Sequence, residues 1–264
     1  MSIHPHSFLS AGKVTLVGAG PGDPELLTIK ALKALQKASV LFVDDLVNPA
    51  IVALASPAAR VVHVGKRGGC KSTPQAFIEK LMVAAAQEGE NVVRLKGGDP
   101  FIFGRGGEEV EALQSHGIAV EVINGITSGL AAVSSLNVPL THREHARGVV
   151  FVTGHAKTGV DAIDWQAMST AAKQAKLTLV IYMGVSGVAH IEAGLLSGLP
   201  ADTPVAIVQN ASLPNQRHAI CALQDLQRCI AEAGLASPSV IIVGEVFRGL
   251  LALSEATGLR EAAG

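Results

Sequence analysis

Two glycine corners that end in Gly-Asp-Pro are the segments of this sequence best suited to chemistry. Residues 14–24 and residues 92–100 each run from a β-branched apolar stretch through glycines into an aspartate and a proline. Glycines just after the carboxyl end of a strand let a ligand approach the backbone, and open parallel sheets bind small molecules at that edge. The aspartate favours a ligand that carries a positive charge or hydroxyl groups.

The second corner continues into the segment with the densest pattern, residues 97–109. Six of its thirteen residues are glycine or proline, which is more than a simple turn requires. Arg105 and Glu108 lie about one helical turn apart where the next helix is predicted to begin. The pair is interpreted either as an exposed salt bridge or as a guanidinium available to an anionic ligand.

A dinucleotide-binding motif is the first alternative for the corner after the first strand. The spacing of residues 18–23 approaches G-x-G-x-x-G, but Asp23 occupies the third glycine position. A carboxylate there repels a pyrophosphate, and Pro21 lacks one of the N–H groups that would bind it. Asp44, at the end of the second predicted strand, could take the role of the ribose-binding acid, so an NAD(P)-binding oxidoreductase stays as an alternative.

Phosphate and metal sites are weaker alternatives. Residues 65–72 approach a Walker A loop, but Cys70 stands where glycine must precede the lysine, which disfavours nucleotide hydrolysis. His142, His145 and His155 have no accompanying carboxylate-rich helical pair, so they are interpreted as surface or substrate-facing side chains and no metal is predicted.

Short apolar runs alternate with helical patterns along the whole chain, which predicts an α/β protein with mostly parallel sheets. Polar residues 139–145 interrupt this alternation, and residues 149–155 open a second set of elements. We therefore expect a disordered tail at 1–11, an N-terminal α/β domain at 12–145 and a C-terminal α/β domain at 146–264. The predicted strands lie near 13–17, 40–43, 61–64, 91–95, 119–123, 149–152, 178–182, 204–208 and 239–243.

Composition limits the possible partners and compartments. The 264 residues are 48% hydrophobic with a net charge of -1, which gives ample material for a core and no basic stripe for nucleic acid. The three cysteines form no C-x-x-C pair, the first residues lack the pattern of a signal peptide, and no uninterrupted apolar run approaches about 18 residues. We expect a cytoplasmic protein with no membrane or nucleic-acid partner.

Several of these motifs resemble the signatures of a known protein family. Residues 17–31 resemble the first signature of the tetrapyrrole (corrin/porphyrin) methylase family, and residues 92–104 resemble its second. Further similarity to members that methylate uroporphyrinogen III lies at residues 43–47, 64–67, 125–128, 139–143 and 151–155, so that it covers residue 13 to about 250. One departure is Asn124-Gly125, where the family's second signature typically closes with Pro-Gly; we expect a local adjustment of the turn.

The resemblance implies two α/β domains with S-adenosylmethionine, the methyl donor, in an active-site cleft between them, and a homodimer. It also implies two successive methylations of the small-molecule tetrapyrrole uroporphyrinogen III, at C2 and C7, giving precorrin-2 by way of precorrin-1 and releasing S-adenosylhomocysteine. That product serves sirohaem, cobalamin or haem d1 synthesis. No unit similar to the oxidase and chelatase half of a bifunctional sirohaem synthase is recognised, so we expect the chain to stop at the methylated product.

Site residues carry over by position in the motifs. The family's proton acceptor and donor match Asp44 and Lys66, and Arg105 is expected to bind a substrate carboxylate and to assist proton movement. Glu108 and Arg143, with Arg105, fall where the family contacts the tetrapyrrole, whose eight carboxylates require such arginines. The cofactor contacts implied are Pro21, Gly97, Gly98, Asp99, Ile102, Thr127, Ser128, Met183 and Ala211.

This residue set suits methyl transfer from a sulfonium, because the reaction neutralises a cation and depends on positioning more than on a strong nucleophile. Other hypotheses remain besides the oxidoreductase. One is a methylase of another substrate in the same family, such as a later corrin intermediate, and another is a tetrapyrrole-binding or cofactor-sensing module without turnover.

Overall fold

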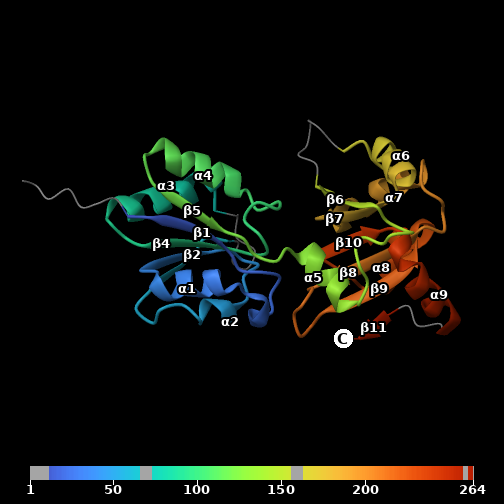
Figure 1. Cartoon of the computed structure of the whole chain (residues 1–264), viewed down its shortest axis with the longest axis horizontal. Coiled ribbons are helices and arrows are strands. Elements are labelled where there is room, and N and C mark those ends of the chain that lie inside the picture. Colours follow the sequence, from blue (N-terminus) through green and yellow to red (C-terminus); the bar gives the residue numbers. More distant parts are fainter. Residues whose placement is uncertain (1–11, 66–72, 156–162, 258–260, 264) are drawn as a thin grey trace, which may run out of the picture. The chain divides into compact units, whose positions relative to one another are not determined.

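The computed structural model describes residues 12–65, 73–155, 163–257 and 261–263. The predicted tail at 1–11, Lys66 and Cys70 lie outside these residues. The chain forms two compact units, Met1–Thr127 and Ser128–Gly264, each built on one sheet (Figure 1). The boundary predicted near residue 145 falls later in the chain than this division. The helix Ser128–Ser135 (α5) packs on the second sheet, where the Gly129 N–H donates to the Tyr182 hydroxyl at 2.9 Å.

The first unit carries a five-stranded sheet in the order β3-β2-β4-β1-β5, in which every strand pair is parallel. Its apolar strands pack on both faces, as parallel sheets require. Its elements are β1 (Val14–Gly18), a 3₁₀ turn η1 (Pro24–Leu26), α1 (Ile29–Lys37), β2 (Val40–Val43), α2 (Pro49–Val52), β3 (Arg60–His63), α3 (Gln75–Gln87), β4 (Val92–Lys96), α4 (Gly106–Ser115) and β5 (Val120–Ile123).

Helices cover both faces of this first sheet because its strands alternate apolar side chains between them. Leu35 of α1 and Ile51 of α2 pack on one face, whereas Met82 of α3 and Leu113 of α4 pack on the other (Figure 1). All four side chains are fully buried. The connections that leave β1 and β4 therefore run to opposite faces of the sheet.

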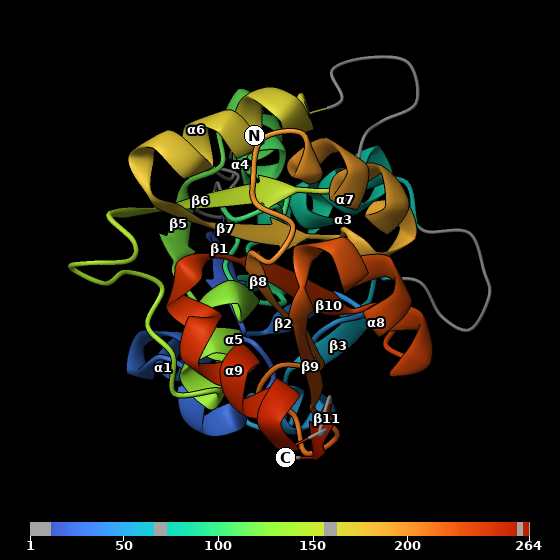
Figure 2. The same cartoon turned by 90° about the vertical axis from the view of Figure 1, so that its right-hand side faces the viewer.

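The second unit carries a six-stranded sheet in the order β11-β9-β8-β10-β7-β6 (Figure 2). Only β6 and β7 pair in parallel, and the other pairs are antiparallel. After α5 its elements are β6 (Gly148–Thr153), α6 (Trp165–Ala175), β7 (Leu177–Tyr182), η2 (Val185–Gly187), α7 (Val188–Leu196), β8 (Pro204–Gln209), β9 (Arg217–Ala222), η3 (Leu223–Asp225), α8 (Leu226–Glu232), β10 (Ser239–Val243), η4 (Glu245–Phe247), α9 (Arg248–Thr257) and β11 (Glu261–Ala263).

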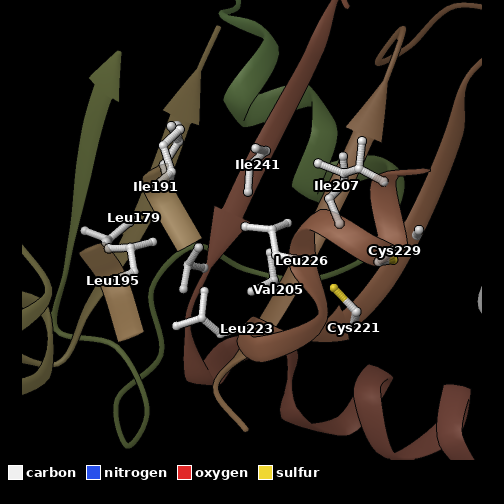
Figure 3. Packing of buried hydrophobic residues seen from close by; sticks show 14 of the residues in the cluster. Leu179, Ile191, Leu195, Val205, Ile207, Cys221, Leu223, Leu226, Cys229 and Ile241 are labelled. Carbon is white, nitrogen blue, oxygen red and sulfur yellow. The ribbon is translucent and has the colours of Figure 1, made fainter. Parts of the chain in front are cut away.

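The core of the second unit lies between its sheet and α6, α7 and α8. Leu179, Ile207 and Ile241 from three strands meet Ile191 and Leu226 from the helices, as Figure 3 shows. The same cluster holds two buried free thiols, Cys221 and Cys229. The contact with Cys229 and then burial raise the pKa of Cys221, so its thiol stays protonated and unreactive.

The prediction of an α/β protein with two such units is confirmed, and all nine predicted strands exist to within a residue at each end. The mostly parallel arrangement describes the first sheet. For the second sheet this prediction is wrong: the predicted strands β7, β8 and β10 pair antiparallel, and so do β9 and β11, which were not predicted. Within the described residues no helix has the length and apolar character that crossing a membrane demands.

Candidate active site

The two Gly-Asp-Pro corners lie side by side at the carboxyl edge of the first sheet. β1 and β4 are neighbours, and the chain leaves them toward opposite faces, so this is the point where the winding of the sheet reverses. Open α/β sheets bind ligands at such a point because the diverging connections leave a crevice between them. The edge of the first unit therefore has the location expected of a ligand site.

Backbone hydrogen bonds join the two corners directly. The Gly20 N–H donates to the Gly98 carbonyl at 3.1 Å, and the Gly98 N–H donates back to the Gly20 carbonyl at 2.7 Å. Both glycines have positive φ, 75° and 66°. A side chain at either position would strain the backbone, so the two glycines are required for the corners to meet.

Asp23 caps the element that follows the first corner. Its Oδ1 accepts the Glu25 N–H at 2.9 Å at the start of η1, and Pro24 occupies the first position of that turn. The helix predicted to start here begins later, at Ile29, where the Thr28 Oγ1 accepts the Ala31 N–H at 3.1 Å. The capping role of Asp23 is confirmed, and Pro21 of the same corner is half-buried.

Asp99 braces the second corner. Its Oδ1 accepts the Phe101 N–H at 2.8 Å, and its Oδ2 accepts the Asn124 side-chain amide and the Gly125 N–H, each at 3.1 Å. The carboxylate is buried, and these bonds tie the end of β4 to the end of β5. Asn124, the departure from the family signature, therefore contributes a donor that a proline lacks.

Three glycines allow the ends of β1, β4 and β5 to converge. A Cβ on Gly18 would lie 2.4 Å from the Gly125 nitrogen, and a Cβ on Gly125 would lie 2.2 Å from the Gly98 carbonyl oxygen. Because both obstacles are backbone atoms, no side-chain rotation could relieve the clash. The strand ends meet as bare backbone, which leaves polar peptide groups at the proposed ligand edge.

The segment after Asp99 holds two residues in the left-handed region, Phe103 at φ 53° and Arg105 at φ 58°. Such a conformation is uncommon for bulky residues and concentrates at ligand sites. Ile102 between Phe101 and Phe103 is half-buried, and Arg105 precedes the first turn of α4. The Arg105 Nε donates to the Glu108 Oε1 at 2.9 Å, and both side chains are more than half exposed. The predicted pair exists, and its guanidinium is accessible to an anion.

Asp44 stands after β2 and faces two cations from β4. The Arg94 Nη2 donates to its Oδ1 at 2.9 Å, and the Lys96 Nζ lies 3.7 Å from its Oδ2. Arg94 and Lys96 are almost fully buried, whereas the Asp44 side chain is 33% exposed. One face of this carboxylate is thus held by buried charges while the other is open to a ligand.

Glu109 of α4 completes the cluster from the buried side. Its Oε1 accepts the Arg94 Nε at 2.9 Å, and the Lys96 Nζ lies 3.1 Å from each of its oxygens. The contact to Oε2 has the distance of an ion pair but not the geometry of a hydrogen bond, and this oxygen accepts none from the described residues. The Gln75 side-chain amide of α3 donates to Oε1 at 3.1 Å.

Burial and charge move the pKa values of the two cations in opposite directions. Burial lowers the pKa of Lys96, Arg94 lowers it further, and the carboxylates of Glu109 and Asp44 only partly oppose this. Burial alone would also lower the pKa of Arg94, but Asp44 and Glu109 outweigh it and raise the value. Lys96 is therefore the cation of the cluster whose charge is held least firmly.

The remaining predicted residues divide between the two units. Thr127 is buried at the end of the first, beyond Gly125, whereas Ser128, Met183, Ala211 and Arg143 belong to the second, which is described by itself. Met183 has φ 54° and an exposed side chain, and Ala211 is buried between Asn210 and Ser212, both with positive φ. Lys66 lies outside the described residues.

Arg143 lies on a tight turn of the second unit. The His142 N–H donates to the Ala146 carbonyl at 2.8 Å and the Ala146 N–H donates back at 2.9 Å, which leaves Arg143 exposed at the tip. The His142 and His145 rings stack with centroids 4.6 Å apart, consistent with a surface role. A hollow of about 250 Å³ beside this turn is lined by Lys173 and Lys176 and by none of the predicted site residues.

Sequence reasoning missed Arg94, Lys96 and Glu109. A signal was present, since positions 94 and 96 lie two apart in an apolar strand and so share one face of a buried sheet. Two cations on such a face require anionic partners. Identifying Glu109 as one of them required the contact between α4 and the sheet.

The chain is similar in sequence to proteins of known function. The model of the family described as Tetrapyrrole (Corrin/Porphyrin) Methylases matches residues 13–227. A Pseudomonas aeruginosa protein named uroporphyrinogen-III C-methyltransferase is 52% identical over 242 residues, covering 91% of this chain and 96% of the relative. A siroheme synthase of Nitrosomonas europaea is 47% identical over 90% of this chain, and the chain spans only 49% of that relative's length.

Solved structures agree in fold. A Thermus thermophilus uroporphyrin-III C-methyl transferase complexed with S-adenyl homocysteine is 40% identical, with a TM-score of 0.76 over 90% of this chain and 94% of that one. A cobalt precorrin-4 methyltransferase of cobalamin biosynthesis is 28% identical, with a TM-score of 0.78 over 89% of this chain and 95% of that one.

Proposed function

The chain belongs to the tetrapyrrole (corrin/porphyrin) methylase family, and from this we propose that it is an S-adenosylmethionine-dependent C-methyltransferase of uroporphyrinogen III. It methylates C2 and then C7, giving precorrin-2 by way of precorrin-1. The observation that carries the proposal is the 52% identity to the Pseudomonas aeruginosa enzyme over 96% of that enzyme's length. Because so little of either chain lies outside the match, the proposal concerns the chain as a whole rather than one segment of it.

The residues of the first unit fit S-adenosylmethionine as the methyl donor. The donor supplies an electrophilic methyl group on a sulfonium, which needs polar backbone atoms and an apolar wall rather than a strong nucleophile. Gly97 and Gly98 leave the backbone accessible, and a Cβ on Gly97 would lie 3.1 Å from the Leu46 Cβ, so a side chain would crowd this corner. Asp99 fixes the corner's shape, and Pro21 and Ile102 flank it.

We extend the cofactor site to Thr127 and Ser128, which follow the Gly125 corner, and to Met183 and Ala211 of the second unit. The left-handed backbone at Met183 and around Ala211 supports this, since strained positions of this kind concentrate where ligands bind. Arg105, Glu108 and Arg143 bind the tetrapyrrole, and the two exposed guanidiniums supply the forks that carboxylates prefer.

Asp44 accepts the proton that the methylated ring carbon must lose. Its carboxylate is paired with Arg94 and Lys96 on one side, while its other face stays open for contact with substrate, as a general base requires. Lys66 is proposed as the proton donor, and Arg105 as the residue that orients a substrate carboxylate and assists proton movement. We also propose that the protein is a cytoplasmic homodimer whose product serves sirohaem, cobalamin or haem d1 synthesis.

Incubation of the purified protein with uroporphyrinogen III and S-adenosylmethionine, without oxygen, tests the proposal. The expected result is a tetrapyrrole with two added methyl groups and an equivalent release of S-adenosylhomocysteine, both measured by mass spectrometry. Absence of methyl transfer under conditions where the Pseudomonas aeruginosa enzyme is active would reject it.

A second candidate is methylation of a later corrin intermediate, favoured by the structural similarity to the cobalt precorrin-4 methyltransferase. Transfer to a precorrin-4 derivative at a rate above that with uroporphyrinogen III would support this alternative. The nicotinamide-dependent alternative is less favoured because Asp23 caps η1 at the position where the pyrophosphate would bind.

A further inference from the structure

A cluster of two cations and two anions lies behind the open face of Asp44. Arg94 and Lys96 come from β4, Glu109 from α4, and Asp44 from the end of β2. Glu109 is fully buried, and only Asp44 reaches solvent. The cluster is therefore a chain of charges that leads from the interior of the first unit to the proposed catalytic carboxylate.

Each carboxylate in this chain contacts both cations. Arg94 bridges the Asp44 Oδ1 and the Glu109 Oε1, both at 2.9 Å, and also donates to the Phe42 carbonyl at 3.3 Å. Lys96 stands between the same two carboxylates, 3.1 Å from Glu109 and 3.7 Å from Asp44. The net charge of the four groups is zero, so loss of any one leaves a buried charge without compensation.

We propose that Lys96 and Glu109 are a positioning pair for Asp44: Glu109 anchors the Lys96 ammonium, and the ammonium holds the second oxygen of the Asp44 carboxylate toward the substrate. This inference rests on the proposed function, because it gives Asp44 its role as proton acceptor. Neither residue of the pair touches substrate, since both are buried beneath Asp44.

The geometry supports positioning over simple neutralisation. Arg94 alone would compensate one carboxylate, and it already binds the Asp44 Oδ1. Lys96 also balances the charge of Glu109, but neutralisation alone does not require its Nζ to lie toward Oδ2, the oxygen of Asp44 that Arg94 does not bind. A hydrogen bond to one oxygen and an ion-pair contact to the other oppose rotation of the carboxylate about its terminal bond, which keeps one lone-pair direction aimed at the open face.

The surroundings of Lys96 make its charge responsive to Glu109. Among the described residues, the charged groups that face it are Arg94 on its own strand, Asp44 after β2 and Glu109 in α4; on β1 the residue paired with it is Gly18. Farther out, at the start of α4, the hydrogen bond to Glu108 raises the pKa of Arg105, and the charges of Glu79 and Glu109 also raise it. Burial and Arg94 already lower the pKa of Lys96, so removing the charge of Glu109 must lower it further.

The pH dependence of kcat in Glu109→Gln tests the pair. The expected result is that the alkaline limb moves to lower pH by about one unit or more, because a charge about 3 Å from the ammonium is lost. Lys96→Met lowers kcat roughly 10- to 100-fold, with an unchanged KM for S-adenosylmethionine, because Asp44 is no longer fixed. Lys96→Arg keeps the charge at every pH, so it restores part of kcat and loses the alkaline limb.

The matched control is Glu121→Gln, which removes another ion-paired carboxylate of the same unit, bonded to Lys13 and Lys30 and outside the cluster. It leaves the alkaline limb unchanged. A shift in this control equal to that in Glu109→Gln would overturn the inference, as would an unshifted limb in Glu109→Gln.

A readout without turnover separates this inference from the proposed function. Carbon-13 NMR of lysine-labelled enzyme, with the Lys96 signal assigned by its loss in Lys96→Met, follows the ammonium directly. The pH at the midpoint of the Lys96 titration is expected to fall in Glu109→Gln and to stay unchanged in Glu121→Gln. An enzyme that shows no methyl transfer rejects the proposed function whatever the NMR shows; an active enzyme with an unmoved Lys96 midpoint rejects only the positioning pair.

Poor folding of the single variants does not block the test. The double variant Lys96→Met/Glu109→Gln removes one cation and one anion together, so the remaining Arg94–Asp44 pair stays balanced. We expect it to fold and to bind S-adenosylmethionine normally by calorimetry, with kcat reduced roughly 10- to 100-fold. A double variant with full kcat would show that Asp44 needs no such support.

Discussion

At the residue scale, the charged side chains of the first unit divide by burial into two groups with different roles. Arg94, Lys96 and Glu109 are buried and bind one another, whereas Arg105 and Glu108 are exposed and form a pair within one turn of α4. An exposed ion pair contributes little to stability. Its guanidinium can therefore exchange Glu108 for a substrate carboxylate at small cost.

Arg105→Lys keeps the positive charge but loses the two-pronged geometry that binds a carboxylate. We expect kcat/KM for uroporphyrinogen III to fall roughly 10- to 100-fold, the effect of losing one charge-assisted hydrogen bond, while the KM for S-adenosylmethionine stays constant. Steady-state kinetics with each substrate varied in turn give both values.

Arg228→Lys is the matched control, because Arg228 is equally exposed and also pairs with a carboxylate three residues away, Asp225. It should leave all kinetic constants unchanged. Full activity in Arg105→Lys would remove Arg105 from the substrate site.

At the scale of elements, the convergence of β1, β4 and β5 depends on glycines that the helices do not require. Gly125 lies against the Gly98 carbonyl, whereas Gly107 of α4 has no atom within 4 Å of the position where a Cβ would stand. The same substitution to alanine can therefore be compared at one glycine that has no space for a Cβ and at one that has space.

We expect Gly125→Ala to destabilise the protein by about 3 kcal/mol or more, since a Cβ 2.2 Å from a backbone oxygen forces the strand ends apart. Gly107→Ala should stabilise it by about 0.5–1 kcal/mol, the difference in helix propensity. Denaturant unfolding of both variants measures the free energies. Equal effects at the two positions would mean that the strand ends do not meet as described.

The outer edge of the first sheet carries an ion pair that responds to pH. Glu121 on β5 binds Lys13 and Lys30, and hydrogen bonds from these two lysines lower its pKa to about 2. A carboxyl group whose pKa falls on folding stabilises the folded state above its ordinary pKa of 4.5, and this contribution is lost as the pH falls toward 2.

Glu121→Gln should accordingly lower the unfolding free energy by about 1 kcal/mol or less near neutral pH, because the lysines are exposed. The difference from the unmodified protein should shrink as the pH falls below 4.5. Urea unfolding at a series of pH values measures it, and a difference that grows toward acid pH would contradict the assignment.

Element by element, the predictions succeeded where local patterns decide the structure. The strands of the first sheet are apolar, β-branched runs bounded by glycine and polar residues, and such runs form strands wherever they are buried. β9 was not predicted because Arg217–Ala222 has a weak strand pattern. Its antiparallel pairing with β8 is a tertiary contact that the local sequence does not indicate. The start of α1 was misplaced because Pro24 can open a 3₁₀ turn as well as a helix.

At the scale of the whole molecule, the protein has almost no net charge, whereas its substrate is highly anionic. The chain carries a net charge of -1, so it has no overall attraction for a substrate with eight carboxylates. In the proposed site, binding comes from local cations such as Arg105 and Arg143, which are exposed and therefore screened by salt.

Raising the ionic strength from about 0.05 to about 0.5 M should raise the KM for uroporphyrinogen III several-fold, because the Debye length falls below the spacing of exposed charges. The KM for S-adenosylmethionine, which binds among backbone groups and apolar side chains in the proposed site, should change much less. Parallel kinetic titrations with both substrates make the comparison, and equal salt dependence would argue against recognition through exposed arginines.

The sequence predicted those parts of the candidate site that lie in local motifs. The glycine corners, Asp44 and Arg105 were located from sequence; the structure describes their contacts, and their roles in the site stay a prediction. The buried charges behind Asp44 were not predicted, because the spacing of Arg94 and Lys96 indicates that anionic partners are needed but not which residues supply them. Whole-molecule similarity confirmed the family but did not show this cluster either.

The balance of that cluster has an evolutionary consequence. Positions 44, 109 and the pair 94 and 96 lie apart in the chain, yet among the described residues each of these charges has its ion-pair partners within this set. A lineage that replaces one of them must pass through a form with an unmatched buried charge unless a second position changes with it. Among descendants of a common ancestor, these four positions should therefore be inherited as a set, or exchanged in pairs of opposite sign.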